Sequence, residues 1–99
     1  MKTPEGYEKD DIKKYLNKHL IWYFCPLMAG YGPSGVPDIV GCYQGKMFGI
    51  EVKRPGKAPT ALQWRRMQDI TDAGGKAFWG TAGKVIAEFE AWIELFPFS

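Results

Sequence analysis

The chain has 99 residues, of which 45% are hydrophobic and 15% aromatic. This length and composition predict one folded domain over residues 1–99, and they exclude a disordered tail or a chain of several domains. The formal net charge of +2 at pH 7 is too small to indicate nucleic-acid binding by itself, so the position of the positive charges matters more than their sum.

The sequence shows neither a membrane span nor a secretory signal. No run reaches the length of an apolar spanning segment, and the first residues include no apolar stretch. Cys25 and Cys42 have no spacing typical of a metal site. We expect buried or half-buried thiols in a reducing cytoplasm, with a disulfide as the alternative.

The first third of the chain alternates between helical and strand patterns. Residues 4–20 carry an apolar stripe at helical spacing that includes Leu20. Residues 21–24 form a short apolar run that predicts a strand. The glycine-rich residues 28–36 predict a loop, which either faces a ligand or is a plain connection.

The middle of the chain predicts a β-hairpin. Residues 38–43 and 47–53 are rich in β-branched and aromatic side chains, which favour strands. Between them, Gln44-Gly45-Lys46 has the length and the glycine of a hairpin turn.

The remaining third predicts two helices around one strand. A basic turn with two prolines at residues 54–59 ends the hairpin, and Thr60 is a suitable N-cap for a helix over residues 61–73. Residues 76–81 favour a strand, and residues 84–96 have the apolar spacing of a closing helix. The predicted fold is α/β, a small mixed β-sheet flanked by helices in the order α-β-β-β-α-β-α.

Three charges interrupt the apolar hairpin. Asp38 opens its first strand, and Glu51 and Lys53 lie at the end of its second strand, two residues apart and therefore on one face. An antiparallel hairpin returns the end of its second strand beside the start of its first, so we expect Asp38 close to Glu51. The alternative is a surface Glu-x-Lys on an amphipathic strand, unrelated to a turn aspartate.

This grouping has the chemistry of a magnesium site. Mg²⁺ takes oxygen ligands, commonly one or two carboxylates, and keeps water and phosphate in its other positions. Asp38 and Glu51 are the predicted carboxylate ligands, and the backbone carbonyl of Val52 is a further one. A lysine such as Lys53 can orient the attacking water or stabilise charge on a phosphate.

Positive charge is concentrated just after the hairpin. Arg54 and Lys57 lie in the basic turn, and Arg65 and Arg66 lie in the first turns of the helix over residues 61–73. The start of a helix also attracts anions. We therefore expect these four side chains to contact a DNA backbone.

These motifs resemble a known nuclease signature. The P-D at residues 37–38 and the E-V-K at residues 51–53 are similar to the PD-(D/E)xK pattern. The fuller run G-V-P-D-I-V-G, then G-x-x-x-G-I-E-V-K, then G-K at residues 56–57 and Gln63, resembles the virus-type replication-repair nuclease family (VRR-NUC). The likeness extends over nearly all of the chain and implies a restriction-endonuclease-like core.

The resemblance also implies an activity and two further site residues. It implies a Mg²⁺-dependent DNA endonuclease, with Mn²⁺ able to substitute, in which Gln63 helps to order the active site. An acid on the first helix reaches toward the metal in this family; Glu8 is the best match and Asp11 the competitor. In the alternative reading, Glu8 only complements the helix dipole and Gln63 is a surface amide.

Standalone short members of the family are similar to structure-selective enzymes that cut four-way DNA junctions as homodimers. The resemblance therefore implies branched DNA as the partner and a homodimer as the active form. The alternatives are a nuclease for flaps, nicks or duplex ends, and a DNA-binding accessory protein without catalysis. The apolar residues 92–98, with Trp22 and Tyr23, are more than a small core readily buries, which favours a dimer interface. Alternatively, they complete the core of the monomer.

Overall fold

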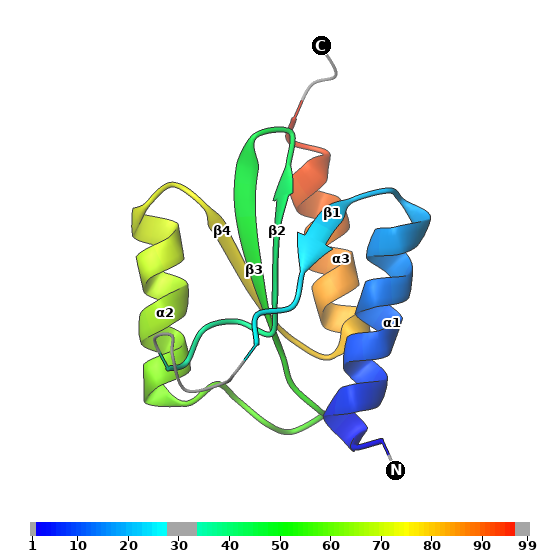
Figure 1. Ribbon diagram of the computed structural model, residues 1–99, viewed down its shortest axis with the longest axis vertical. Coiled ribbons are helices and arrows are strands. Elements are labelled where there is room, and N and C mark those ends of the chain that lie inside the picture. The colour runs from blue at the N-terminus through cyan, green and yellow to red at the C-terminus, as the bar shows by residue number, and fades with distance from the viewer. Residues whose placement is uncertain (1, 28–33, 97–99) are drawn as a thin grey trace.

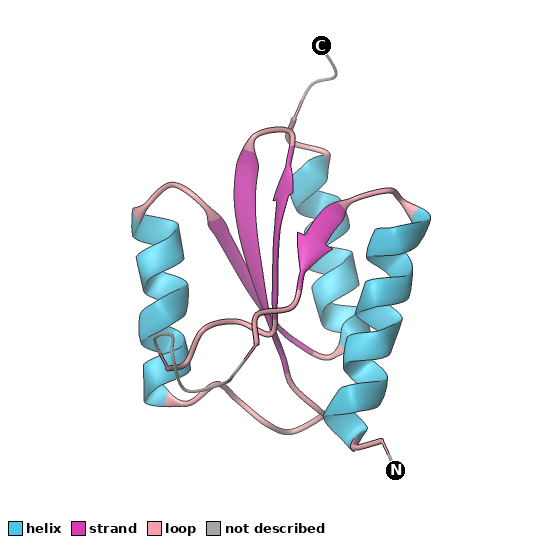
Figure 2. Ribbon diagram, viewed as in Figure 1, coloured by secondary structure: helices cyan, strands magenta, loops and turns pink. Residues whose placement is uncertain are grey.

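The computed structural model describes residues 2–27 and 34–96. Within them the predicted order of elements, the α/β class and the mixed sheet are confirmed (Figure 1, Figure 2). The elements are α1 (Pro4–Lys18), β1 (Trp22–Phe24), β2 (Ile39–Tyr43), β3 (Lys46–Val52), α2 (Ala61–Asp72), β4 (Lys76–Gly80) and α3 (Ala82–Ile93).

The sheet has the strand order β1-β2-β3-β4, so the two hairpin strands are central. Pairing is antiparallel from β1 to β3, while β4 joins β3 in parallel after the α2 crossover. The hairpin turn is one residue shorter than predicted. Gln44 and Gly45 have φ angles of 48° and 82°, and Lys46 already belongs to β3. Two central residues with positive φ make the tight turn that suits twisted antiparallel strands.

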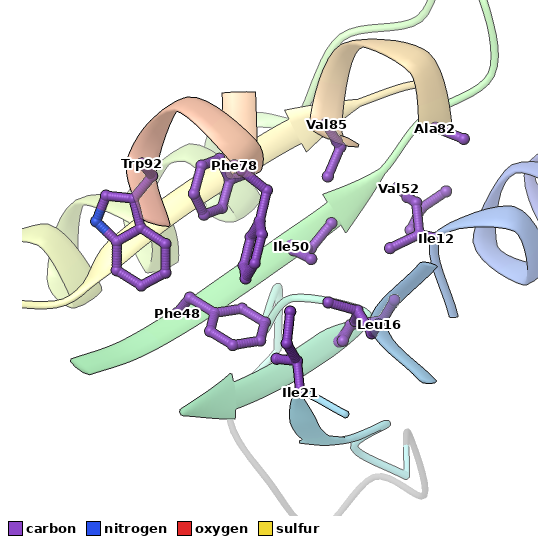
Figure 3. Packing of buried hydrophobic residues seen from close by; sticks show 12 residues of the cluster. Ile12, Leu16, Ile21, Phe48, Ile50, Val52, Phe78, Ala82, Val85 and Trp92 are labelled. Atoms are coloured by element: carbon purple, nitrogen blue, oxygen red, sulfur yellow. The ribbon is translucent and has the colours of Figure 1, made fainter. Parts of the chain in front are cut away.

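One face of the sheet carries the main apolar core, which α1 and α3 cover (Figure 1, Figure 3). Phe48, Ile50 and Val52 of β3 are buried on this face. Phe48 meets Phe89 of α3 edge to face, with ring centroids 4.9 Å apart. Because successive residues of a strand point to opposite faces, this register turns Glu51 toward the other face, against which α2 packs.

One end of the sheet gathers the starts of α1, α2 and α3 (Figure 1). Each helix begins after a threonine whose side chain accepts a backbone hydrogen bond from the first turn; these are Thr3, Thr60 and Thr81. The carboxyl ends of β3 and β4 lie at the same end, joined by a hydrogen bond from the Lys53 N–H to the Gly80 carbonyl at 2.8 Å. Helix starts carry partial positive charge, so this end of the sheet favours anions.

Two helices differ from the predicted ranges by more than one residue. α1 ends at Lys18, and Leu20 has a φ of 57° and is 93% exposed, so its assignment to the apolar stripe was wrong. α3 begins at Ala82, because Thr81 is its N-cap, and it ends at Ile93. The predicted range of 84–96 did not take the N-cap preference of Thr81 into account.

The aromatic residues near the C-terminus belong mostly to the core. Trp92 is buried, and Tyr23 and Phe96 pack against the same cluster. Trp92, Ile93 and Phe96 thus complete the core of the monomer, whereas Leu95 of the same stretch is 74% exposed. Residues 97–98 lie outside the described residues. Trp22, by contrast, is 63% exposed on β1.

The two cysteines are free thiols. Cys25 is half-buried as expected, whereas Cys42 is exposed, so the expectation of burial was wrong for Cys42. Cys42 lies on the face of β2 that α1 and α3 do not cover, opposite Trp22 of β1. In the described ranges, the helices are too short or too polar to cross a membrane.

Candidate active site

The structure brings the two hairpin carboxyl groups together, as the sequence predicts. Ile39 pairs with Ile50, so the preceding Asp38 lies opposite Glu51. Oδ2 of Asp38 accepts a hydrogen bond of 2.9 Å from the Val52 N–H, which fixes the carboxylate at the end of β3. The pair therefore results from strand register and a backbone contact, and needs no flexible loop to form it.

Glu51 is a buried acid with a strongly perturbed pKa. Its exposed fraction is only 3%. Burial, the hydrogen bond with Asp38 and the charge of Asp38 together raise its pKa from 4.5 to about 9, with burial the largest cause. Glu51 is therefore protonated at neutral pH in the absence of a bound metal ion.

Lys53 completes the predicted group. It follows β3 directly and is only 9% exposed, although lysine is rarely buried without a partner. Its charge lowers the pKa of Glu51, against the larger effects of burial and Asp38, which places the ammonium near that carboxyl. Buried Glu51, half-buried Asp38 and buried Lys53 thus share one end of the two central strands.

The Val52 carbonyl is directed toward the same place. The N–H of Val52 binds Asp38, whereas the N–H of Lys53 binds Gly80 of β4. The N–H and C=O of one strand residue point to the same side, so the Val52 carbonyl points toward Asp38. This orientation suits its predicted part as an oxygen ligand.

The acids of the first helix have different surroundings. Oε1 of Glu8 accepts a hydrogen bond of 2.8 Å from the Ala82 N–H, so Glu8 caps the start of α3. Asp11 is exposed. The acid of α1 whose charge raises the pKa of Glu51 is Glu5. Glu5 was not among the predicted site residues, although it lies one helical turn before Glu8 and the helical spacing could have indicated it.

Glu5 also lines an open cavity of about 280 Å³ at the start of α1, together with Thr3, Pro4 and Arg54. Arg54 follows Lys53 directly, so the cavity adjoins the group of buried charges. An acid and a guanidinium on its walls make it suitable for a polar ligand.

Gln63 has a defined contact at the start of α2. Its Oε1 accepts a hydrogen bond from the Thr60 N–H at 2.9 Å, and the Thr60 hydroxyl accepts one from the Gln63 N–H at 3.2 Å. This capping box fixes where α2 begins after β3. If Gln63 helps to order the active site, it does so by fixing the position of the start of α2. The catalytic role of Gln63 stays a prediction.

The four predicted DNA-contacting cations have different surroundings. Arg66 donates to the Ser34 carbonyl at 3.0 Å and pairs with Asp69 at 2.8 Å, so it ties the segment before β2 to α2. Arg65 is 73% exposed, with Asp69 at 3.8 Å. Arg54 and Lys57 are exposed in the turn after β3. Residues 28–33 of the predicted ligand-facing loop lie outside the described residues.

A comparison of the chain with protein-family models and with curated proteins found no match. The resemblance to the VRR-NUC family therefore rests on the hairpin motif and stays a prediction. The placement of Asp38, Glu51 and Lys53 is a separate observation, since it follows from the strand register and from burial.

The donor set suits Mg²⁺ better than a metal that needs a closed protein cage. In the described parts of the chain, no three His, Cys, Asp or Glu side chains form a metal-binding group. Mg²⁺ is typically bound through one or two carboxylates, with waters and substrate phosphate completing the octahedron. A pair of carboxyl groups that holds a proton between them can hold a divalent cation there instead, since both neutralise the second charge.

Proposed function

We propose that the protein is a Mg²⁺-dependent DNA endonuclease, which hydrolyses phosphodiester bonds. The observation that carries this proposal is the pairing of buried Glu51 with Asp38, beside buried Lys53, at the anion-favouring end of the sheet. Apolar residues would stabilise a purely structural strand end at least as well as buried charges do. Buried acids with perturbed pKa values are typical of functional sites.

Each residue of the group has a distinct part in the proposal. Asp38 and Glu51 hold the metal through their carboxylates, with the Val52 carbonyl as a further ligand. Bound Mg²⁺ supplies Lewis acidity and lowers the pKa of water. Lys53 donates a hydrogen bond to the attacking water or to the phosphate, and its positive charge offsets the negative charge that develops there.

The surroundings of this group support a phosphate-containing substrate. The starts of α1, α2 and α3, which carry partial positive charge, lie at the same end of the sheet as this group (Figure 1). Arg54, Lys57 and Arg65 are exposed near the same end and supply positive charge for a DNA backbone. Arg66, which is engaged with Ser34 and Asp69, supports the site by holding the segment before β2.

Within this proposal the substrate is branched DNA, in particular a four-way junction, and the active form is a homodimer. Paired cuts in two strands require two active sites, and a two-fold dimer supplies them. Trp22 and Phe24 support such an assembly, since both are exposed on edge strand β1 with ring centroids 5.8 Å apart. Flaps, nicks and duplex ends are the alternative substrates.

A cleavage assay tests the proposal. The wild-type protein is incubated with a labelled four-way junction, a flap and a linear duplex, each with Mg²⁺, with Mn²⁺ and with EDTA. We expect metal-dependent cleavage, strongest for the junction, and its loss in Asp38→Asn but not in the surface control Asp72→Asn. The proposal is wrong if no substrate is cut with either metal, or if Asp38→Asn cuts as the wild type does.

A further inference from the structure

A second cavity lies on the other side of β4 from β3. It has a volume of about 310 Å³ and is lined by residues of α2, β4 and α3. This volume is at the lower end of the range of small-ligand sites. The predicted group of carboxylates and cations does not include any of its lining residues.

Two tryptophans form the aromatic part of the lining. Trp64 of α2 and Trp79 of β4 meet at a ring-centroid distance of 5.5 Å and an interplanar angle of 75°. Trp64 is 47% exposed, which is unusual for so large an apolar side chain in a helix that packs on the sheet. Its exposed ring surface gives a planar ligand a platform for stacking.

The backbone of edge strand β4 gives the cavity a hydrogen-bonding side. Gly80 directs its carbonyl to β3, where it binds the Lys53 N–H. Trp79, the residue before it, directs its carbonyl outward and accepts a hydrogen bond of 2.6 Å from Nζ of Lys84. By the same alternation, Ala77 points its N–H and C=O outward, and Ala77 lines the cavity. A donor and an acceptor side by side match the edge of a nucleobase.

The charge at the cavity decides which planar ligand fits. Nζ of Lys84 lies 4.1 Å from the centroid of the Trp79 ring and 3.2 Å from the Glu88 carboxylate. A cationic ligand would have to compete with this ammonium for the same ring. A neutral base joined to a phosphate is compatible with it, because the lysine can also pair with the phosphate.

The cavity is close to the candidate active site. In the pairing of β3 with β4, Trp79 is the partner of Glu51. Asp38, Glu51 and Trp79 therefore lie in one row across three neighbouring chain segments, and adjacent strands are about 4.8 Å apart. If a DNA strand placed one phosphate at the pair of Asp38 and Glu51, the base of an adjacent nucleotide could therefore enter the cavity.

We propose that this cavity binds one unpaired nucleobase of a DNA strand, by stacking on Trp64 and by hydrogen bonds to the edge of β4. The inference rests on the proposed function, which supplies the DNA strand. It adds a preference for substrates in which a base near the cut is unstacked, as at a branch point or in a single strand.

Binding of short oligonucleotides in EDTA tests this inference without cleavage. The probe is a fluorescently labelled single strand of thymidines, and a second strand of the same length carries abasic sites in place of bases. Trp64→Leu should weaken binding of the first strand about tenfold, in line with the loss of one base–aromatic stack. The control is Leu20→Ala, which removes an exposed apolar side chain that follows α1 and should bind as the wild type does.

Three further results bear on the inference. Trp64→Phe should restore most of the affinity, and circular dichroism should show that each variant is folded. The abasic strand should bind the wild type and Trp64→Leu equally, since the backbone contacts are the same. Equal affinity of the wild type and Trp64→Leu for the thymidine strand, or an equal loss in Leu20→Ala, would overturn the inference.

The binding assay and the cleavage assay can refute the two proposals independently of each other. A protein that cuts duplex and junction DNA but whose strand binding is independent of Trp64 contradicts the cavity inference alone. A protein that cuts nothing but loses strand binding in Trp64→Leu contradicts the endonuclease proposal alone. Absence of any binding to the thymidine strand overturns the inference, and the cleavage assay then decides the proposed function by itself.

Discussion

Replacement of Glu51 by glutamine should stabilise the metal-free protein while it abolishes cleavage. In the folded protein, burial and Asp38 raise the pKa of Glu51 from 4.5 to about 9. In the unfolded chain the carboxyl ionises at its ordinary pKa, so unfolding releases a proton at any pH between these two values. The stabilisation from the protonated acid is complete below pH 4.5 and is lost progressively as the pH rises through this window.

The size of the effect follows from the same two pKa values. pH 7 lies about 2.5 pH units above 4.5, and each unit corresponds to 1.36 kcal/mol. Glu51 therefore lowers the free energy of unfolding at pH 7 by about 3 kcal/mol relative to a side chain that stays neutral. Glutamine is neutral and nearly isosteric, and its amide N–H can donate to Asp38. A gain of this size is a large fraction of the stability of a small domain.

Urea unfolding of the wild type and Glu51→Gln at pH 5, 6, 7 and 8, in EDTA, measures this difference. We expect the two proteins to diverge as the pH rises, with Glu51→Gln the more stable by about 3 kcal/mol at pH 7. Glu94→Gln, at an exposed glutamate, should stay within about 0.5 kcal/mol of the wild type. Mg²⁺ at 100 times its Kd should add about 2.7 kcal/mol to the wild type only. Parallel pH profiles for the wild type and Glu51→Gln would refute the reasoning.

Four further outcomes are expected. Asp38→Ala should abolish cleavage but keep the fold and most of the DNA affinity, as circular dichroism and gel-shift titration would show; near-normal turnover with Mg²⁺ would exclude Asp38 as a ligand. Lys53→Ala should cut turnover severely while calorimetry still detects metal binding; rescue by saturating metal would indicate a structural role instead. Glu8→Gln should lower stability by about 1 kcal/mol in urea unfolding, because it weakens the cap of α3, with kcat retained; a lost kcat at unchanged stability would contradict this. Sedimentation equilibrium at micromolar concentration should show a dimer that Trp22→Ser weakens; a monomer that cuts both junction strands in one binding event would exclude the dimer.

The hairpin and its charged group could be predicted because their determinants are local in the sequence. Alternation of side chains fixed the face of Glu51, and hairpin connectivity placed Asp38 opposite it, as the register shows. The extra residue assigned to the turn did not disturb this pairing. Gln44 adopts a positive φ, which a non-glycine residue seldom does, so the shorter turn was less evident.

The acid of the first helix could not be chosen from the sequence. Glu5 and Glu8 are three residues apart and share one side of α1, so helical spacing does not separate them. Their contacts depend on how α1 lies against α3, where Glu8 meets the Ala82 N–H. The same limit applies to Trp92, whose burial depends on the packing of α3 against Phe48 and Phe78 (Figure 3).

The electrostatics of the sheet end favour a ligand that carries both signs of charge. Three helix starts and the exposed Arg54 attract an anion, whereas Asp38 and Glu51 repel one until a cation or a proton neutralises them. A divalent cation bound to a phosphate satisfies both demands at once, because its charge pairs the carboxylates while the phosphate oxygens meet the helix starts. Neither ion alone would do so. The protonated state of Glu51 is thus the form that this site takes without its ligand, and the loss of that proton with rising pH should strengthen metal binding.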